Sequence, residues 1–154
     1  MKFLKLQTEI LKDWFNYKTK DTAPKWKACK YKDDFYVTDN KVLVCIPKCF
    51  FILNVDEDTP KLSETSVEKF TKEPSDFEVF EKTTRIETCS DCLATVYEPK
   101  QGDRKPVLLN KKYLDFFESD CIVKSTGPDY PVYIYETNLA NEEIFRGILM
   151  PVMK

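Results

Sequence analysis

The sequence contains no histidine and only three glycines among its 154 residues. Without histidine there is no Ser-His or Cys-His nucleophile pair, no histidine general base and no histidine-containing metal site. The glycines, Gly102, Gly127 and Gly147, lie far apart, whereas phosphate-binding loops need several glycines close together. The acidic groups at 33–34 and 56–58 fall at turns, where solvation is their ordinary role. We therefore predict that the protein is not an enzyme.

Long apolar runs are also missing. No run approaches the roughly 20 residues that a membrane-spanning helix needs. The first segment, MKFLKLQTEILKDW, is interrupted by Lys5, Gln7 and Glu9, so it lacks the continuous apolar core of a signal peptide. A formal net charge of −2 gives no whole-protein attraction for nucleic acid. These features predict a cytoplasmic protein of about one domain, with no membrane partner.

Six cysteines are present, and in the cytoplasm cysteines are more often thiols than disulfides. Four of them form two close pairs, Cys45 with Cys49 and Cys89 with Cys92. Two such pairs could hold a structural zinc ion, and the second pair has the common zinc-knuckle spacing. The first pair lies in an apolar, strand-like segment, which favours buried free thiols. We expect reduced cysteines without metal or cofactor, and a cysteine–zinc structural protein is the alternative.

The two ends of the sequence share one pattern of apolar residues. Aligning FLKLQTEILKDWF with PVLLNKKYLDFFE pairs Leu6 with Leu109, Ile10 with Tyr113, Leu11 with Leu114 and Trp14 with Phe117. Each segment reads as a short strand that leads into an amphipathic helix, and three strand candidates follow each helix. The pattern predicts an α+β fold of two strand–helix–three-strand repeats, with antiparallel sheets and both helices on one side.

We assign the two halves to residues 1–55 and 104–154 of a single domain, with a divergent middle at 56–103. In the first half, strands are expected at 2–7, 25–32, 33–39 and 41–47, and the helix follows Thr8 as its cap. In the second half, strands are expected at 106–109, 121–127, 130–137 and 143–152, and Asn110 is the expected helix cap. In the middle, a capping box at Thr65 and Glu68 predicts a short helix.

These features resemble the bacterial DNA sliding clamp (DNA polymerase III beta subunit) family, in which two such repeats make one domain. The opening MKF with Ile10, Leu11 and Trp14 is similar to the first strand and helix of that family. FYVTDNKVLV resembles its T-D-G-H-R-L turn, NKKYLDFF its second helix and STGPDYPVYI the strand pair that follows. GILMPVMK resembles its closing strand, which usually ends M-P-M-R-L. The resemblance covers the two ends of the chain and implies a single clamp-like domain, whereas clamp subunits carry three.

The resemblance implies a peptide-binding groove beside the closing strand. In clamps, this strand and the T-D turn line an apolar pocket that receives leucine or phenylalanine side chains of a partner's short peptide. The corresponding residues here are Thr38, Leu43, Ile148, Met150, Pro151 and Val152. Residues 40–42 depart from the family's Gly-His-Arg, and Met153 stands where arginine is usual, so the polar rim of the groove differs. The alternative is that these residues form an edge strand that only covers the core.

Clamps also encircle DNA, with positively charged helix faces against the phosphates. The corresponding lysines here are Lys5, Lys12, Lys20 and Lys112, and they are diluted by Glu9, Asp13 and Asp115. A solvated face of mixed charge explains these lysines better than a DNA track does. Any binding to duplex DNA should therefore be weak.

Three hypotheses follow. The first is a non-enzymatic clamp-like protein that binds DNA or replication proteins, of the kind that a phage or mobile element would carry, and that could form a homo-oligomer as clamps do. The second is a clamp-fold interaction module that binds a protein partner through its closing strand and has no role on DNA. The third is the cysteine–zinc structural protein.

Overall fold

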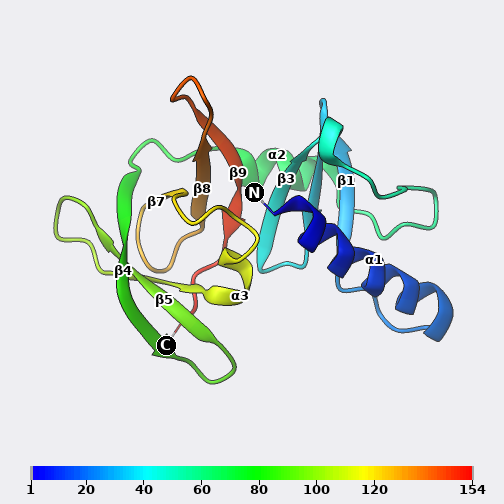
Figure 1. Ribbon diagram of the computed structural model, residues 1–154, viewed down its shortest axis with the longest axis horizontal. Coiled ribbons are helices and arrows are strands. Elements are labelled where there is room, and N and C mark those ends of the chain that lie inside the picture. Colours follow the sequence, from blue (N-terminus) through cyan, green and yellow to red (C-terminus); the bar gives the residue numbers. More distant parts are fainter. Residues whose placement is uncertain (1, 154) are drawn as a thin grey trace. The chain divides into compact units, whose positions relative to one another are not determined.

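The computed structural model describes residues 2–153, which form an α+β protein with antiparallel strand pairs and, in this range, three α helices (Figure 1). The predicted fold class is confirmed at this level. The chain divides into two compact units, an N-terminal unit (Lys2–Lys72) and a C-terminal unit that starts at Glu73. Each unit is described by itself. None of the helices in the described range is long and apolar enough to cross a membrane.

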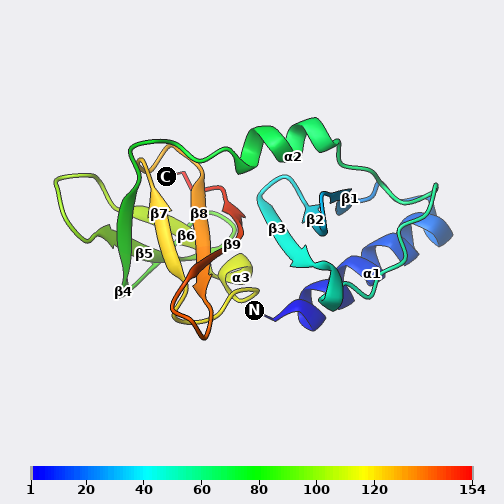
Figure 2. The same ribbon diagram turned by 90° about the horizontal axis from the view of Figure 1, so that it is seen from above.

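The N-terminal unit is a three-stranded antiparallel sheet with one helix on each face (Figures 1 and 2). Its elements are α1 (Phe3–Lys20), β1 (Lys27–Tyr31), β2 (Asp34–Thr38), β3 (Val42–Pro47), the 3-10 helix η1 (Lys48–Phe50) and α2 (Glu64–Thr71). Five consecutive residues of β3, from Val42 to Ile46, are buried, in agreement with a sheet that is covered on both faces. The edge of β1 is covered by residues 60–62, which exchange backbone hydrogen bonds with Ala28.

Helix α1 packs through Leu6, Ile10 and Trp14, which are all buried. Side chains at this spacing lie on one face of a helix, and removing each from water contributes about 1.5–3 kcal/mol to folding. The indole N–H of Trp14 also donates to the carbonyl oxygen of Trp26 over 2.9 Å. This hydrogen bond fastens the helix to the segment that enters β1.

The predicted strand at residues 2–7 is wrong, because α1 already begins at Phe3. A strand would place Leu4 and Leu6 on the same face, but Leu6 is fully buried and Leu4 is exposed. The helical spacing of Leu6, Ile10 and Trp14 thus extends back to the start of the chain. Leu11 was also expected on the buried face, and it is exposed. The first half therefore has the predicted helix and three strands without a leading strand.

The cap of α2 also differs from the prediction. Ser63 caps this helix, because its extended backbone turns its hydroxyl to accept the backbone N–H of Ser66 over 3.2 Å. The predicted box at Thr65 and Glu68 lies inside the helix, which already starts at Glu64.

The C-terminal unit is a six-stranded antiparallel sheet in the order β9-β8-β7-β4-β5-β6. Its strands are β4 (Glu78–Thr88), β5 (Leu93–Pro99), β6 (Val107–Asn110), β7 (Ile122–Ser125), β8 (Val132–Thr137) and β9 (Glu143–Leu149). Helix α3 (Lys111–Leu114) directly follows β6. The predicted succession of strand, helix and three strands is confirmed in this half. The predicted placement of both repeat helices on one side remains a prediction.

The cap predicted at Asn110 is confirmed, because its side-chain oxygen accepts the backbone N–H of Lys112 over 2.9 Å. The helix is shorter than expected and ends at Leu114. Tyr113 in the helix and Phe117 beyond its end are both buried. These two residues thus reach the core although the helix is short.

The last strand ends at Leu149, three residues earlier than predicted. Leu149 is paired with Val132, and the residue before Val132 is Pro131, which has no N–H for a further pair. Pro151 likewise has no N–H to donate. The chain leaves β8 at this point, and the backbone N–H of Val152 donates to the carbonyl oxygen of Leu108 in β6 over 2.8 Å.

Candidate functional site

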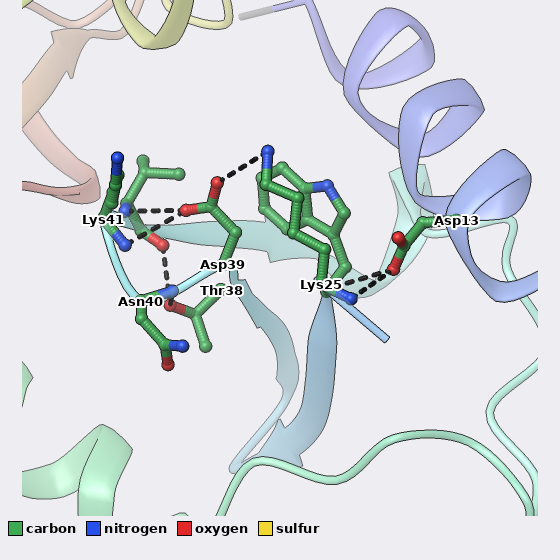
Figure 3. A network of polar contacts seen from close by, with 8 residues as sticks. Asp13, Lys25, Thr38, Asp39, Asn40 and Lys41 are labelled. Carbon is green, nitrogen blue, oxygen red and sulfur yellow. Dashed lines mark hydrogen bonds and ion pairs between the residues drawn. The ribbon is translucent and has the colours of Figure 1, made fainter. Parts of the chain in front are cut away.

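The turn between β2 and β3, where the sequence predicts one side of the groove, is held by its own polar side chains (Figure 3). The Thr38 hydroxyl donates to the carbonyl oxygen of Val42 over 2.7 Å and accepts the N–H of Asn40. The Asp39 carboxylate accepts the N–H groups of Lys41 and Val42. Asn40 has a φ of 71°, a left-handed conformation in which asparagine is enriched. The hydrogen bonds of these polar groups therefore stabilise the turn itself.

Asp39 also links this turn to the segment before β1, and Asp13 links that segment to α1 (Figure 3). Its side chain is fully buried and pairs with the Lys25 ammonium group over 3.2 Å. The backbone N–H groups of Lys25 and Trp26 both donate to the Asp13 carboxylate of α1 over 2.9 Å. A buried carboxylate with a cation and two N–H partners is satisfied inside the fold. Asp39 consequently stabilises the N-terminal unit and presents no charge to a ligand.

Three of the predicted groove residues, Thr38, Leu43 and Ile148, are buried. Thr38 and Leu43 lie opposite each other in the β2–β3 pair, and Ile148 lies opposite Tyr133 in the β8–β9 pair. Their side chains offer little surface to a ligand. The joint groove stays a prediction, because Thr38 and Leu43 belong to the N-terminal unit and the other members to the C-terminal unit.

The accessible members of the predicted groove are in the closing segment, which we define as residues 150–153. Met150 is 43% exposed, Met153 is exposed, and Pro151 and Val152 are half-buried. The hydrogen bond from Val152 to Leu108 holds this backbone along β6. Methionine side chains adapt to ligands of different shape. The closing segment therefore combines a fixed backbone with apolar side chains that solvent can reach.

The four predicted DNA-contact lysines are all exposed: Lys5, Lys12 and Lys20 on α1, and Lys112 on α3. Lys5 and Lys12 are seven residues apart, so they lie two turns apart on the same side of α1. Lys20, the last residue of α1, is displaced around the helix from this line. Within α1, only two of the lysines can therefore contact one row of phosphates together.

A feature that the sequence analysis missed is a row of large apolar side chains on the solvent side of α1. Leu4, Leu11 and Phe15 are between 58% and 68% exposed. Their spacing of seven and four residues puts them on one side of a helix. The signal was present in the sequence, but it depends on the helix starting at Phe3, and the expected strand concealed it.

Within residues 2–153, the six cysteines form no disulfide; Cys29 and Cys45 are buried and Cys49 is exposed. Cys89 and Cys92 close the β4–β5 turn, where the N–H of Cys89 donates to the carbonyl oxygen of Cys92 over 2.9 Å. Within residues 2–153, no three side chains of histidine, cysteine, aspartate or glutamate are arranged to hold a metal ion.

Burial decides the chemistry of the remaining cysteine. Together with a smaller contribution from the nearby Glu136 carboxylate, it raises the pKa of the Cys121 thiol to about 11. Burial, with a contribution from Glu64, also raises the pKa of Cys29. Both thiols are therefore protonated near neutral pH, whereas the nucleophile and metal ligand is the thiolate.

Comparison with known proteins adds no family to this description. No protein-family model matches the chain, and no curated protein and no solved structure matches it. The likeness to the sliding-clamp family accordingly depends on the short sequence motifs alone.

Proposed function

We propose that this chain is a non-enzymatic, clamp-like protein that binds a partner protein through its closing segment. The observation that carries the proposal is the combination of accessible Met150 and Met153 side chains with a backbone held at Val152. Removal of apolar side chains from water by a partner favours binding. A backbone that is already fixed loses little conformational entropy when the partner binds.

The chemistry of the closing segment favours recognition by side-chain anchors. Pro151 cannot donate a backbone hydrogen bond, so a partner strand cannot extend the sheet regularly along this segment. Leucine or phenylalanine side chains of a short peptide, which the clamp resemblance implies, would instead pack between Met150 and Met153. The proposed partner is thus a protein with such a peptide, as replication proteins that bind clamps have.

We favour a protein partner over DNA because of the residues on α1. Lys5 and Lys12 lie beside the exposed Leu4, Leu11 and Phe15, and apolar side chains gain nothing from contact with phosphate groups. The version of the proposal without a role on DNA therefore has the better support.

The proposal is tested by fluorescence anisotropy with a short labelled peptide that carries leucine and phenylalanine anchors. We expect saturable binding by the parent protein and an at least tenfold loss of affinity, about 1.4 kcal/mol, in Met150→Ala. The thermal unfolding midpoint of this variant should stay unchanged, because the Met150 side chain is partly exposed. The matched control is Leu139→Ala, which removes a fully exposed side chain of the same unit and should change neither quantity.

Two outcomes would contradict the proposal. One is a parent protein that does not bind the peptide. The other is a Met150→Ala variant that binds normally but loses about 2–5 kcal/mol of stability, as buried methionines do. The closing segment would then be part of the core packing only.

A further inference from the structure

We propose that the solvent side of α1 is a second protein-binding surface, whose partner is an amphipathic helix with acidic flanks. The surface starts with Leu4, Leu11 and Phe15, which form a row that we call the α1 ridge. With a rise of 1.5 Å per residue, the ridge is roughly 16 Å long. The buried side of α1 faces the sheet of the N-terminal unit (Figures 1 and 2), so the ridge is not part of that core.

A second segment supplies more apolar surface beside the ridge. The buried Gln7 side chain donates from its amide nitrogen to the carbonyl oxygen of Phe50 over 2.9 Å, and its oxygen accepts the N–H of Ile52 over 2.8 Å. The ring of Phe3 stacks on the ring of Phe50, with 5.2 Å between their centroids. Phe50 and Ile52 are themselves exposed. Gln7 follows Leu4 by three residues and precedes Leu11 by four, so it lies beside them on the helix surface. Its hydrogen bonds therefore fix the backbone at Phe50 and Ile52 on this side of α1.

This arrangement differs from the scattered exposed apolar residues that are normal on protein surfaces. Five large side chains lie on two segments, and hydrogen bonds from one buried amide hold those segments together. Such a surface is organised before any partner arrives, which lowers the entropy cost of binding.

The shape of the ridge selects a helix as the partner. On α1 the ridge is one side chain wide, with Thr8 and Lys12 along one side of it and the segment of Phe50 and Ile52 along the other. A narrow row at helical spacing fits the groove between the side-chain rows of a second helix. Insertion into a lipid surface requires a broad apolar face instead.

The charges around the surface select acidic flanks on that helix. Lys12 is exposed on α1 next to the ridge, and Lys48 is exposed two residues before Phe50. Of the acidic residues on α1, Asp13 is occupied by two backbone N–H groups of the β1 entry and Glu9 is half-buried. Aspartate or glutamate beside the apolar anchors of the partner would complement this rim. A second copy of the chain would bring lysines against lysines, so self-association through this surface is disfavoured.

The test is a selection with the full chain against a display library of short helical peptides, followed by affinity measurements on the enriched sequences. We expect enrichment of leucine, isoleucine or phenylalanine at i, i+3 or i+4, and i+7, flanked by aspartate and glutamate. Leu11→Ser and Phe15→Ser should each weaken binding of an enriched peptide at least tenfold. Lys12→Glu should weaken it several-fold and strengthen binding of the same peptide with lysine in its flanks.

The controls separate this surface from the closing segment. Leu139→Ser removes a still more exposed apolar side chain, in the C-terminal unit, and Met150→Ala alters the closing segment, so neither should change binding of the helical peptide. The inference would be overturned by enrichment of basic peptides, by no enrichment, or by binding that Leu11→Ser leaves intact. Capture of the chain by phosphatidylserine vesicles instead of peptides, or a dimer that Leu11→Ser dissociates, would also overturn it.

Discussion

Gly102 occupies a position in the β5–β6 loop that other residues cannot take without strain. Its φ is +88°, and a Cβ atom there would lie 2.9 Å from the Oε1 atom of Glu78. The other carboxylate oxygen of Glu78 pairs with the Arg104 guanidinium group over 2.9 Å, and Arg104 also donates to the carbonyl oxygens of Thr126 and Asp76. Glu78 therefore has little freedom to move away.

We predict that Gly102→Ala lowers the free energy of unfolding by about 1–2 kcal/mol, because it adds backbone strain and displaces Glu78. Chemical denaturation in urea would measure the loss. Gly127 also has a positive φ, +151°, but a Cβ there would meet only the Tyr130 side chain at 3.8 Å. Gly127→Ala is therefore a comparison variant that adds backbone strain without the close contact. A loss in Gly127→Ala as large as in Gly102→Ala would show that backbone strain alone, and not the contact with Glu78, accounts for the effect.

The Asp39 carboxylate, which is fully buried, should matter more than a carboxylate on the surface. Asp39→Ala removes the acceptor of two backbone N–H groups and the partner of the half-exposed Lys25 ammonium group, so we predict a loss of about 1–3 kcal/mol. Asp56 makes an ion pair of the same length with Lys18, but both of its partners are well exposed. Asp56→Ala should therefore change stability far less, and urea denaturation of both variants compares them.

The Cys121 thiol gives a prediction on reactivity. A pKa of about 11 in place of an ordinary value of 9.0 lowers the thiolate fraction near neutral pH by roughly a hundredfold. Alkylation by iodoacetamide, followed by mass spectrometry, should therefore label exposed Cys49 long before Cys121. Labelling of Cys121 should speed up as the pH rises towards 11. Equal labelling rates of the two residues in the native protein, and not only in urea, would contradict this prediction.

At the scale of the elements, the closing segment also protects an edge of the sheet. β6 is an edge strand, and Val152 occupies the carbonyl oxygen of Leu108 on it. We predict that deleting residues 150–154 costs stability as well as peptide binding, and that the freed edge promotes association of the chains. Thermal unfolding, anisotropy and light scattering of the truncated chain would measure the three effects. A truncated chain as stable and as soluble as the parent would show that the hydrogen bond to β6 is dispensable.

The positions of most strands could be predicted from the sequence, because alternating apolar residues and turn signals bound them. The failures lie where a local pattern fits two structures. Leu4 and Leu6 alternate as in a strand, yet Leu6 also belongs to the helical row with Ile10 and Trp14. The segment is a helix because that longer row packs in the core. Ser63 and Thr65 are both good caps, and only the backbone path distinguishes them. The end of β9 depends on its partner at Pro131, which the sequence of β9 does not contain.

The candidate surfaces were less predictable than the strands. The T-D turn could be found as a motif, but its Asp39 proved to be bonded inside the fold, and a motif does not reveal the direction of a side chain. Met150 is accessible, whereas Thr38 and Leu43 are buried, and the groove that was to join them stays a prediction. The α1 ridge was hidden because the apolar pattern of the helix includes exposed Leu11 together with buried Ile10 and Trp14, and burial is a property of the packed helix.

At the scale of the whole molecule, the modest charge limits any interaction with DNA. With only Lys5 and Lys12 on one side of α1 and a net charge of −2, about two phosphates can be neutralised, so the log–log salt slope should be about −2. Titration of labelled duplex DNA at several salt concentrations would measure this slope. Lys12→Gln should reduce the slope by about 1. Tight binding that resists salt would show that a DNA-binding surface has been overlooked.

The hydrogen bond between Val152 and Leu108 has a consequence for the order of folding. It joins two residues that lie far apart in the sequence, whereas β7 and β8 pair across a short turn. Contacts between distant residues cost more chain entropy than local hairpins, so they form later. The N-terminal unit has all of its own helices and strands within residues 2–72, and its folding does not depend on this contact. The β6 border of the C-terminal sheet would thus be covered only after the hairpins of that sheet have formed.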